Sequence, residues 1–278
     1  MIHVWRYIAE RFPLQVTLPI AAIIAFGVMP ALHGSWQVYA AALSTVWLGL
    51  FLLRATDDLH SIDTDRIKSP GRGLVTGFIR AASLRYACLV ALLLIMTLYI
   101  RQPEALAFIG ILLLYYWIWH RSSRHLPILC HPFGSNLIFA ALPIFLGLVQ
   151  TGKVGMASLG SAGFMYFAAI AHEYAHNAGE RKPAPLRTYD SAIGARGTAA
   201  AAGILFLFSF LCGLWMSFYI QEAAGFRGML LAHLIANMYF IIRLIRRPVA
   251  ADARKFYILG FTFFLLPLAA RIVERLIS

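Results

Sequence analysis

The chain alternates long apolar stretches with short polar interruptions. Nine stretches are apolar enough to form helices across a hydrocarbon core of about 30 Å. They are residues 14–32, 36–53, 81–100, 103–119, 126–149, 154–171, 197–220, 224–242 and 256–273. The runs lack the strict alternation of a barrel strand, and a backbone in lipid has to satisfy its own hydrogen bonds. The pattern therefore predicts an all-α, polytopic membrane bundle of about nine transmembrane helices.

Composition supports a lipid environment. Hydrophobic residues make up 60% of the 278 positions, only 13% are charged, and the mean hydropathy is +0.73. Such a chain cannot form an ordinary soluble surface, so we expect a single integral membrane domain over residues 1–278 whose partner is the lipid bilayer. The three cysteines lie isolated within apolar runs, which argues against a disulfide framework and a cysteine metal site.

The basic residues predict the orientation. The 24 Lys and Arg residues outnumber the 12 Asp and Glu residues and give a net charge of +12. With the N-terminus in the cytoplasm, most of them fall on that side, and the opposite loops hold only Arg101, Lys153 and Arg227. The N-terminus and the two longest polar loops are then cytoplasmic. No basic stretch is interleaved with exposed aromatic residues in a polar domain, so we expect no nucleic-acid partner.

Those two loops, residues 54–80 and 173–196, share one design. Each begins with acidic residues at helical spacing, continues into Lys and Arg, and then reaches Pro or Gly, which end a helix. At about 100° per residue, positions three and seven apart share a helix face. One face carries Asp58, Ser61 and Asp65 with Asp57 beside it, and the other carries Glu173, His176 and Glu180 with Asn177 beside it.

Acidic groups gathered in this way repel one another unless a cation lies between them. Hard oxygen ligands favour Mg²⁺, which completes its shell with water and substrate phosphates. The candidate metal ligands are Asp57, Asp58, Ser61, Asp65, Glu173, His176, Asn177 and Glu180, of which Asp58, Asp65, Glu173 and Glu180 are the candidate catalytic residues. The alternative is that the acidic residues only balance neighbouring bases at the membrane surface.

The basic residues that follow each acidic face fit a phosphate ligand, because guanidinium groups bind phosphate oxygens in pairs. Basic cytoplasmic loops are also expected from topology alone. The candidate diphosphate-binding residues are Arg66, Lys68, Arg72, Arg181, Lys182 and Arg187.

The first loop resembles the first signature of the UbiA superfamily of intramembrane prenyltransferases. In that signature an (N/D)DxxDxxxD helix end is followed by a basic loop that contains proline, as in RATDDLHSIDTDRIKSPGRG here. Asp57, Asp58 and Asp65 match the pattern, whereas Ser61 stands where the family usually has an aspartate. The second loop is similar to the family's second acidic motif, with Glu173, His176 and Glu180 in place of aspartates. Nine helices, with motifs at the ends of the second and sixth, also look like this family.

The resemblance implies Mg²⁺-dependent transfer of a prenyl group from a polyprenyl diphosphate to an aromatic or other electron-rich lipophilic acceptor, with release of diphosphate. The candidate substrate-pocket residues are Arg54, Tyr115, Tyr116, Arg121 and Tyr189. Tyr115 and Tyr116 belong to an aromatic group that is also typical of an interfacial belt. The departures from the motifs indicate a divergent member, and some relatives are similar to terpene cyclases, so cyclisation of the prenyl diphosphate stays an alternative.

Two further alternatives come from other motifs. Residues 172–176 read HEYAH and satisfy HExxH, the helical zinc site of metalloproteases, although no third ligand is evident. Asp190, the nearest downstream acidic residue, is placed to cap the next helix. A transporter or lipid-binding protein would carry polar groups deep in its spans. Asn136, His233 and Asn237 lie there, and we expect them to form hydrogen bonds between helices.

Overall fold

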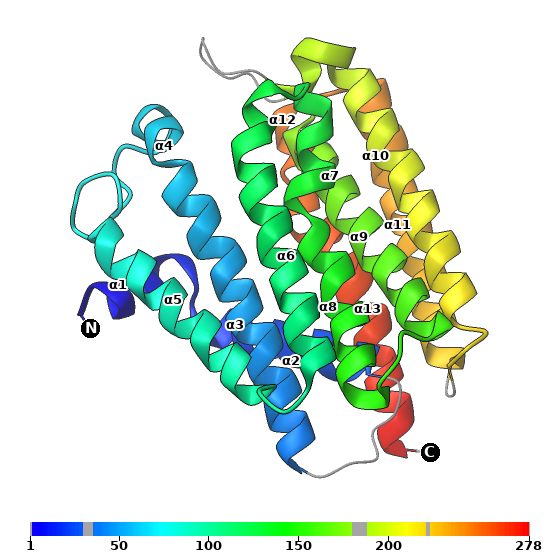
Figure 1. Cartoon of the computed structure of the whole chain (residues 1–278). Helices are drawn as coiled ribbons and strands as arrows, with labels where there is room; N and C mark the ends of the chain where they lie inside the picture. The colour runs from blue at the N-terminus through cyan, green and yellow to red at the C-terminus, as the bar shows by residue number, and fades with distance from the viewer. Residues whose placement is uncertain (1, 30–35, 180–187, 221–222, 278) are drawn as a thin grey trace. The chain divides into compact units, whose positions relative to one another are not determined.

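The computed structural model describes residues 2–29, 36–179, 188–220 and 223–277, and the regular structure in these ranges is helical (Figure 1). The elements are α1 (Ile2–Arg11), α2 (Leu14–Val28), α3 (Trp36–His60), α4 (Ile62–Lys68), α5 (Ala81–Leu98), α6 (Pro103–Ser122), η1 (Ser123–His125), η2 (Ile128–Cys130), α7 (His131–Ser135), α8 (Leu137–Thr151), α9 (Met156–Asn177), α10 (Tyr189–Met216), α11 (Ala224–Arg246), α12 (Ala250–Ala253) and α13 (Phe256–Ile277). The predicted site residues Glu180, Arg181, Lys182 and Arg187 lie outside the described residues.

The prediction of about nine spans has to be corrected. In the described ranges, seven helical segments are long and apolar enough to cross a membrane, or eight if the pair α1 and α2 forms one span bent by 72°. When eight are counted, the missing segment is α9, the predicted span 154–171, and when seven are counted, α2 of the predicted span 14–32 is missing too. Helix α9 is 22 residues long, but its serine, glycine, histidine and glutamate residues lower its hydropathy, and much of it is buried among other helices. The all-α, multi-pass membrane architecture is confirmed, and the sidedness of the spans stays a prediction.

The chain forms two compact units, and each is described by itself. The first comprises Met1–Phe26 and His33–Leu106, and the second comprises Gly27–Leu32 and Ala107–Ser278. The first acidic motif lies in the first unit and the second motif in the second unit. The single functional domain expected for residues 1–278 stays a prediction.

In the first unit, α1 and α5 pack against the motif end of α3. The core there includes Tyr7 and Phe12 from the N-terminus, Phe51 and Ala55 from α3, and Leu84 from α5. The chain bends between α1 and α2 at Pro13, which lacks the N–H that a continuing helix would use. This bend lets α1 lie beside the first acidic motif.

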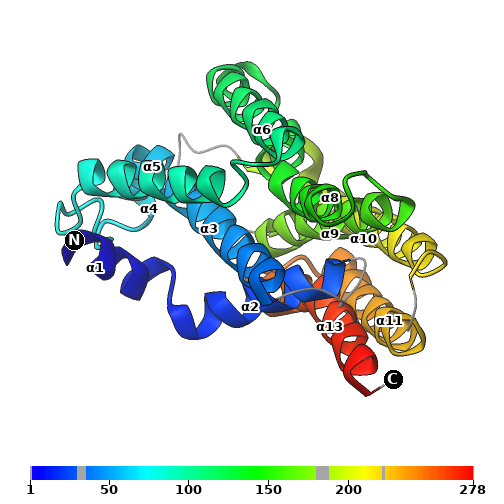
Figure 2. The ribbon, with the colours of Figure 1, turned by 60° about the horizontal axis from the view of Figure 1, so that its bottom comes forward.

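In the second unit, α9 is surrounded by α8, α10 and α13 (Figure 2). Phe164 of α9 is fully buried and contacts the rings of Phe226 and Phe263. The helices approach closely where α9 carries small residues, as is common in membrane bundles, where packing drives association. Gly160 faces the backbone of Met216 on α10, and Gly163 faces Cys212. The small residues that lower the hydropathy of α9 therefore allow its central position.

Two arginines of α13 donate hydrogen bonds to backbone carbonyls at the carboxyl end of α2. The fully buried Arg271 donates Nη1 to the carbonyl of Gly27 at 2.5 Å, and Arg275 donates Nη1 to that of Met29 at 3.0 Å. The last carbonyls of a helix have no partner within the helix, so these contacts satisfy groups that would be costly in an apolar environment. The sequence pattern gave no indication of this pairing.

We predict that Gly160→Ala lowers the thermal stability of the protein. A Cβ atom at this position would lie 2.9 Å from Cα of Met216, so α9 and α10 would have to separate. Overpacking of this kind costs about 1–3 kcal/mol of unfolding free energy. Gly110→Ala on α6 is the matched control, because nothing lies within 4 Å of its added methyl group. Thermal unfolding of both variants in detergent measures the effect, and equal midpoints would show that the approach of α9 to α10 is not as close as described.

Candidate functional site

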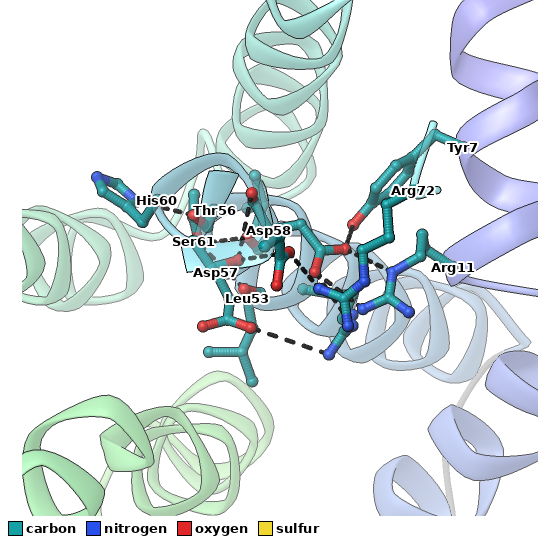
Figure 3. A network of polar contacts seen from close by, with 12 residues as sticks. Tyr7, Arg11, Leu53, Thr56, Asp57, Asp58, His60, Ser61 and Arg72 are labelled. Carbon is teal, nitrogen blue, oxygen red and sulfur yellow. Dashed lines mark hydrogen bonds and ion pairs between the residues drawn. The ribbon is translucent and has the colours of Figure 1, made fainter. Parts of the chain in front are cut away.

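Asp58 is the centre of the first polar cluster, at the end of α3. Its side chain is buried, and four donor atoms surround it, as many as the lone-pair sites of a carboxylate. The Tyr7 hydroxyl donates to Oδ2 at 2.9 Å, and Arg11 donates Nε to Oδ2 at 3.1 Å and Nη2 to Oδ1 at 3.0 Å. Arg54 completes the set with an ion pair from Nη2 to Oδ1 at 3.1 Å. Figure 3 shows Tyr7 and Arg11 directed toward Asp58.

Asp65 lies one helical segment further on, in α4. Helix α3 ends at His60, and α4 begins at Ile62, so the single helix end predicted for residues 57–65 is broken at Ser61. Despite the break, Ser61 Oγ donates to Asp65 Oδ2 at 3.2 Å, and Arg72 forms an ion pair with the same oxygen. Asp58 and Asp65 therefore lie on the same side of the helix end, as the spacing predicted, but each carboxylate is paired with arginine.

Helix α1 supplies the part of this cluster that the sequence pattern did not predict. Tyr7, Glu10 and Arg11 share one face of α1, and Glu10 Oε1 accepts the backbone N–H of Gly73 at 3.1 Å. A Cβ atom at Gly73 would lie 2.6 Å from Glu10 Oε2, so a side chain at this position would displace the Glu10 carboxylate. One feature of the sequence could have indicated this role. Polar residues at positions 7, 10 and 11 fall on one face of the amphipathic N-terminal segment.

Together these residues line a small pocket in the first unit. Its walls are Glu10, Arg11, Asp58, Asp65, Arg72, Leu74 and Ile79. We call the polar members, with Tyr7 and Arg54, the aspartate–arginine cluster. Arg72 is the predicted diphosphate ligand of the first loop that reaches this pocket.

The remaining predicted residues of the first loop are exposed. Asp57 lies outside the pocket with its carboxylate 3.9 Å from Nη1 of Arg54. Arg66 forms an exposed ion pair at 2.8 Å with Asp63, the residue expected to point away from the acidic face. Lys68 is exposed as well. Arg54, predicted to line a substrate pocket, instead pairs with both Asp57 and Asp58.

Glu173 is the centre of a second polar cluster, in the second unit. Asn136 donates Nδ2 to Glu173 Oε2 at 2.7 Å, and the Tyr189 hydroxyl donates to Oε1. Asn177 donates its amide to the Glu173 carbonyl at 2.7 Å. The interhelical role expected of Asn136 is confirmed, whereas the prediction for Asn237 is wrong in the described residues, because its amide bonds the His233 carbonyl of the same helix.

The start of α10 brings Tyr189 to this cluster. Thr188 caps the helix through a capping box with Ser191, so the prediction that Asp190 is the cap is wrong. Asp190 instead accepts the N–H of Gly179 at 2.7 Å, just beyond the end of α9. These contacts fix the first turn of α10 against the motif end of α9.

Tyrosine hydroxyls hold the broken helical segment that presents Asn136. Tyr115 and Tyr116 of α6 donate to the carbonyls of Gly134 and Ser135 at 3.2 and 3.4 Å. Tyr174 of α9 donates to the carbonyl of Leu129 at 2.6 Å. Irregular backbone within a membrane bundle needs such partners. The structure thus gives the predicted pocket residues Tyr115 and Tyr116 a role in supporting the Glu173 cluster.

Arg121 does not join either cluster. It is exposed on α6, and its guanidinium lies 4.3 Å from the ring centroid of Trp117, itself exposed. This arrangement is typical of the membrane interface.

The histidines of the HExxH motif pack in the interior of the second unit. His172 is buried, its Nδ1 lies 2.7 Å from the carbonyl of Phe256, and its ring lies against Phe261. His176 lies against His172 and Tyr257, so it faces α13, whereas Glu173 faces α7 and α10. Within the described ranges no group of three His, Cys, Asp or Glu side chains could hold a metal ion. The HExxH pattern therefore lacks a third zinc ligand in this part of the chain.

The donor chemistry nevertheless fits Mg²⁺. Asp57, Asp58, Asp65 and Glu173 offer hard carboxylate oxygens, and no soft thiolate lies among them. Asp57 is exposed and Asp65 keeps Oδ1 without a close donor among the described residues, but Asp58 is fully surrounded by protein donors. The carboxylates of the first motif are thus of the ligand type that Mg²⁺ prefers, and in this structure guanidinium groups pair with the oxygens of Asp58 and with one oxygen of Asp65.

Comparison with known proteins identifies the fold. No protein-family model matches the chain, and no curated protein matches its sequence. A solved structure of digeranylgeranylglyceryl phosphate synthase in membranes matches with a TM-score of 0.68 over 100% of both chains, at 17% identity. That enzyme is a UbiA superfamily prenyltransferase. The UbiA-like fold that the motifs suggested is therefore confirmed over the full length of the chain.

Proposed function

We propose that this protein is an intramembrane prenyltransferase. It transfers a prenyl group from a polyprenyl diphosphate to an aromatic or other electron-rich lipophilic acceptor and releases diphosphate. The observation that carries the proposal is the coincidence of a full-length fold match to a membrane prenyltransferase with acidic motifs at the ends of α3 and α9. Neither observation alone is sufficient, because one fold can serve several functions.

The proposed roles follow the chemistry of the side chains. Asp57, Asp58 and Asp65 in the first motif, and Glu173 and Glu180 in the second, would hold Mg²⁺, which would neutralise charge that develops on the departing diphosphate. Arg72 and the other loop bases would bind the diphosphate oxygens. Asn136 and Tyr189 orient Glu173, since each donates to one of its oxygens.

The reaction proceeds by cleavage of the bond between the prenyl C1 atom and the diphosphate oxygen. The electron pair leaves with the diphosphate, and an allylic cation remains. An electron-rich atom of the acceptor forms the new bond, and the proton that it loses passes to a base or to water. In a cyclase the substrate's own double bond would supply these electrons. The departures at Ser61 and His176 from the family pattern keep that outcome as the second candidate.

Product analysis separates these reactions. Membranes that contain the protein are supplied with Mg²⁺ and prenyl diphosphates of increasing length, with and without aromatic acceptors. We expect diphosphate release that depends on the acceptor, together with a prenylated product. Release with a cyclised hydrocarbon and no acceptor would replace the transferase with a cyclase. Zinc-dependent peptide cleavage by the same membranes, lost on chelation, would favour the protease alternative.

A further inference from the structure

The aspartate–arginine cluster is electrically balanced in the absence of any ligand. Glu10, Asp58 and Asp65 contribute three carboxylates, and Arg11, Arg54 and Arg72 contribute three guanidinium groups. A divalent cation that approached alone would meet guanidinium groups already bound to both oxygens of Asp58 and to one oxygen of Asp65. The cluster therefore disfavours bare Mg²⁺, although it contains magnesium ligands.

Two of the three carboxylates lie deeper than the guanidinium groups, whereas Glu10 is exposed. The side chains of Asp58 and Asp65 are only 3% and 8% exposed, whereas those of Arg11, Arg54 and Arg72 are 21%, 37% and 30% exposed. The guanidinium groups thus cover the buried carboxylates. An anion that approaches the cluster from outside meets these partly exposed guanidinium groups before the two buried aspartates, and arginine binds phosphate oxygens in a bidentate manner.

From this layering we infer that Arg11, with Arg54 and Arg72, binds the diphosphate of the substrate, and that Mg²⁺ binds Asp58 only after the diphosphate has drawn these arginines away. The inference rests on the proposed function and adds Arg11 of α1 as a diphosphate ligand, together with an order of binding. Tyr7 is the neutral donor that remains on Asp58 when the arginines leave. Glu10 keeps α1 in place through Gly73.

Two binding measurements on the purified protein in detergent test the order. Mn²⁺, a paramagnetic substitute for Mg²⁺, is titrated without diphosphate and followed by electron paramagnetic resonance. Inorganic diphosphate is titrated in the presence of EDTA by calorimetry. The variants are Arg11→Gln and, as a charge-retaining substitution, Arg11→Lys. Arg6→Gln is the matched control, since Arg6 lies on the same helix but stacks on Phe78 at 4.1 Å.

We expect Arg11→Gln to bind one more equivalent of Mn²⁺ than wild type when diphosphate is absent, because Asp58 loses two of its four donor atoms and each of its oxygens keeps only one. The same variant should bind inorganic diphosphate about tenfold more weakly, as expected for the loss of charge-assisted hydrogen bonds. Arg11→Lys should retain the wild-type Mn²⁺ stoichiometry and still weaken diphosphate binding. Arg6→Gln should match wild type in both titrations.

The outcomes separate this inference from the proposed function. Equal Mn²⁺ stoichiometry in wild type and a folded Arg11→Gln variant would overturn the binding order, and equal diphosphate affinity would overturn Arg11 as a diphosphate ligand. Either result would leave prenyl transfer intact. If Arg11→Gln does not fold, wild-type diphosphate affinity in Arg11→Lys overturns it instead. A wild-type protein that binds neither Mn²⁺ nor diphosphate, even when both are present, would contradict the proposed function itself.

Discussion

Replacement of Asp58 by asparagine should lower the rate of prenyl transfer by about 100-fold or more, the usual cost of removing a group that stabilises developing charge. Asparagine can keep a hydrogen bond to Tyr7 and has nearly the same volume, so the side chain still fills its site. It removes the charge that pairs with Arg11 and Arg54, which makes it a poor metal ligand. The initial rate of diphosphate release, measured at equal protein amounts, gives the effect.

Asp63→Asn is the matched control for this substitution. Asp63 lies five residues away, is 88% exposed and pairs only with the exposed Arg66 among the described residues. Surface ion pairs of this kind contribute little to stability. We expect the activity of Asp63→Asn to stay within about twofold of wild type. A similar loss of activity in both variants would show that removing any negative charge from this loop lowers the rate. Asp58 would then have no special role.

The second large effect is expected for Glu173→Gln, which should also lower the transfer rate by about 100-fold. A glutamine can still accept a hydrogen bond from Asn136 and can donate one to the Tyr189 hydroxyl. The side chain therefore keeps both partners, although the direction of the bond to Tyr189 is reversed. What the variant loses is the negative charge. The thermal midpoint should therefore stay close to wild type while the rate falls.

Tyr189→Phe distinguishes charge from orientation at the same site. It removes one hydrogen bond to Glu173 and leaves the carboxylate in place. We expect a loss of about tenfold or less, in line with a single hydrogen bond to a charged group. If Tyr189→Phe reduced the rate as strongly as Glu173→Gln, the orientation of Glu173 would matter more than its charge, and its role as a metal ligand would have to be given up.

The sequence predicted the architecture well because apolar runs of span length have few other solutions in lipid. Within the described residues, each of the nine predicted stretches contains a helix, but α9 is not among the helices with the hydropathy of a span. The glycines and serines of α9 allow close packing against α8 and α10. Hydropathy measures affinity for lipid, so it does not detect this packing role. The apolar run 154–171 still predicted this helix, and only its hydropathy over a full span length falls short.

Helical spacing also predicted correctly that Asp58 and Asp65 share a side. It could not predict their partners, because Tyr7 and Arg11 lie 51 and 47 residues away in the sequence from Asp58. The same limit applies to Asn136, whose hydrogen bond to Glu173 depends on a break between α7 and α8. Contacts between distant segments arise from packing, and local periodicity carries no information about them.

The central claim is that the protein uses a prenyl diphosphate as its substrate. The most direct test is diphosphate release from geranylgeranyl diphosphate by the purified protein in liposomes that also contain aromatic acceptors, with Mg²⁺ or with EDTA. A protein with both Asp58→Asn and Glu173→Gln serves as the blank. The account predicts release with Mg²⁺, none with EDTA and none from the blank. Prenyl diphosphates of every length that remain intact, with any acceptor tried, would contradict it.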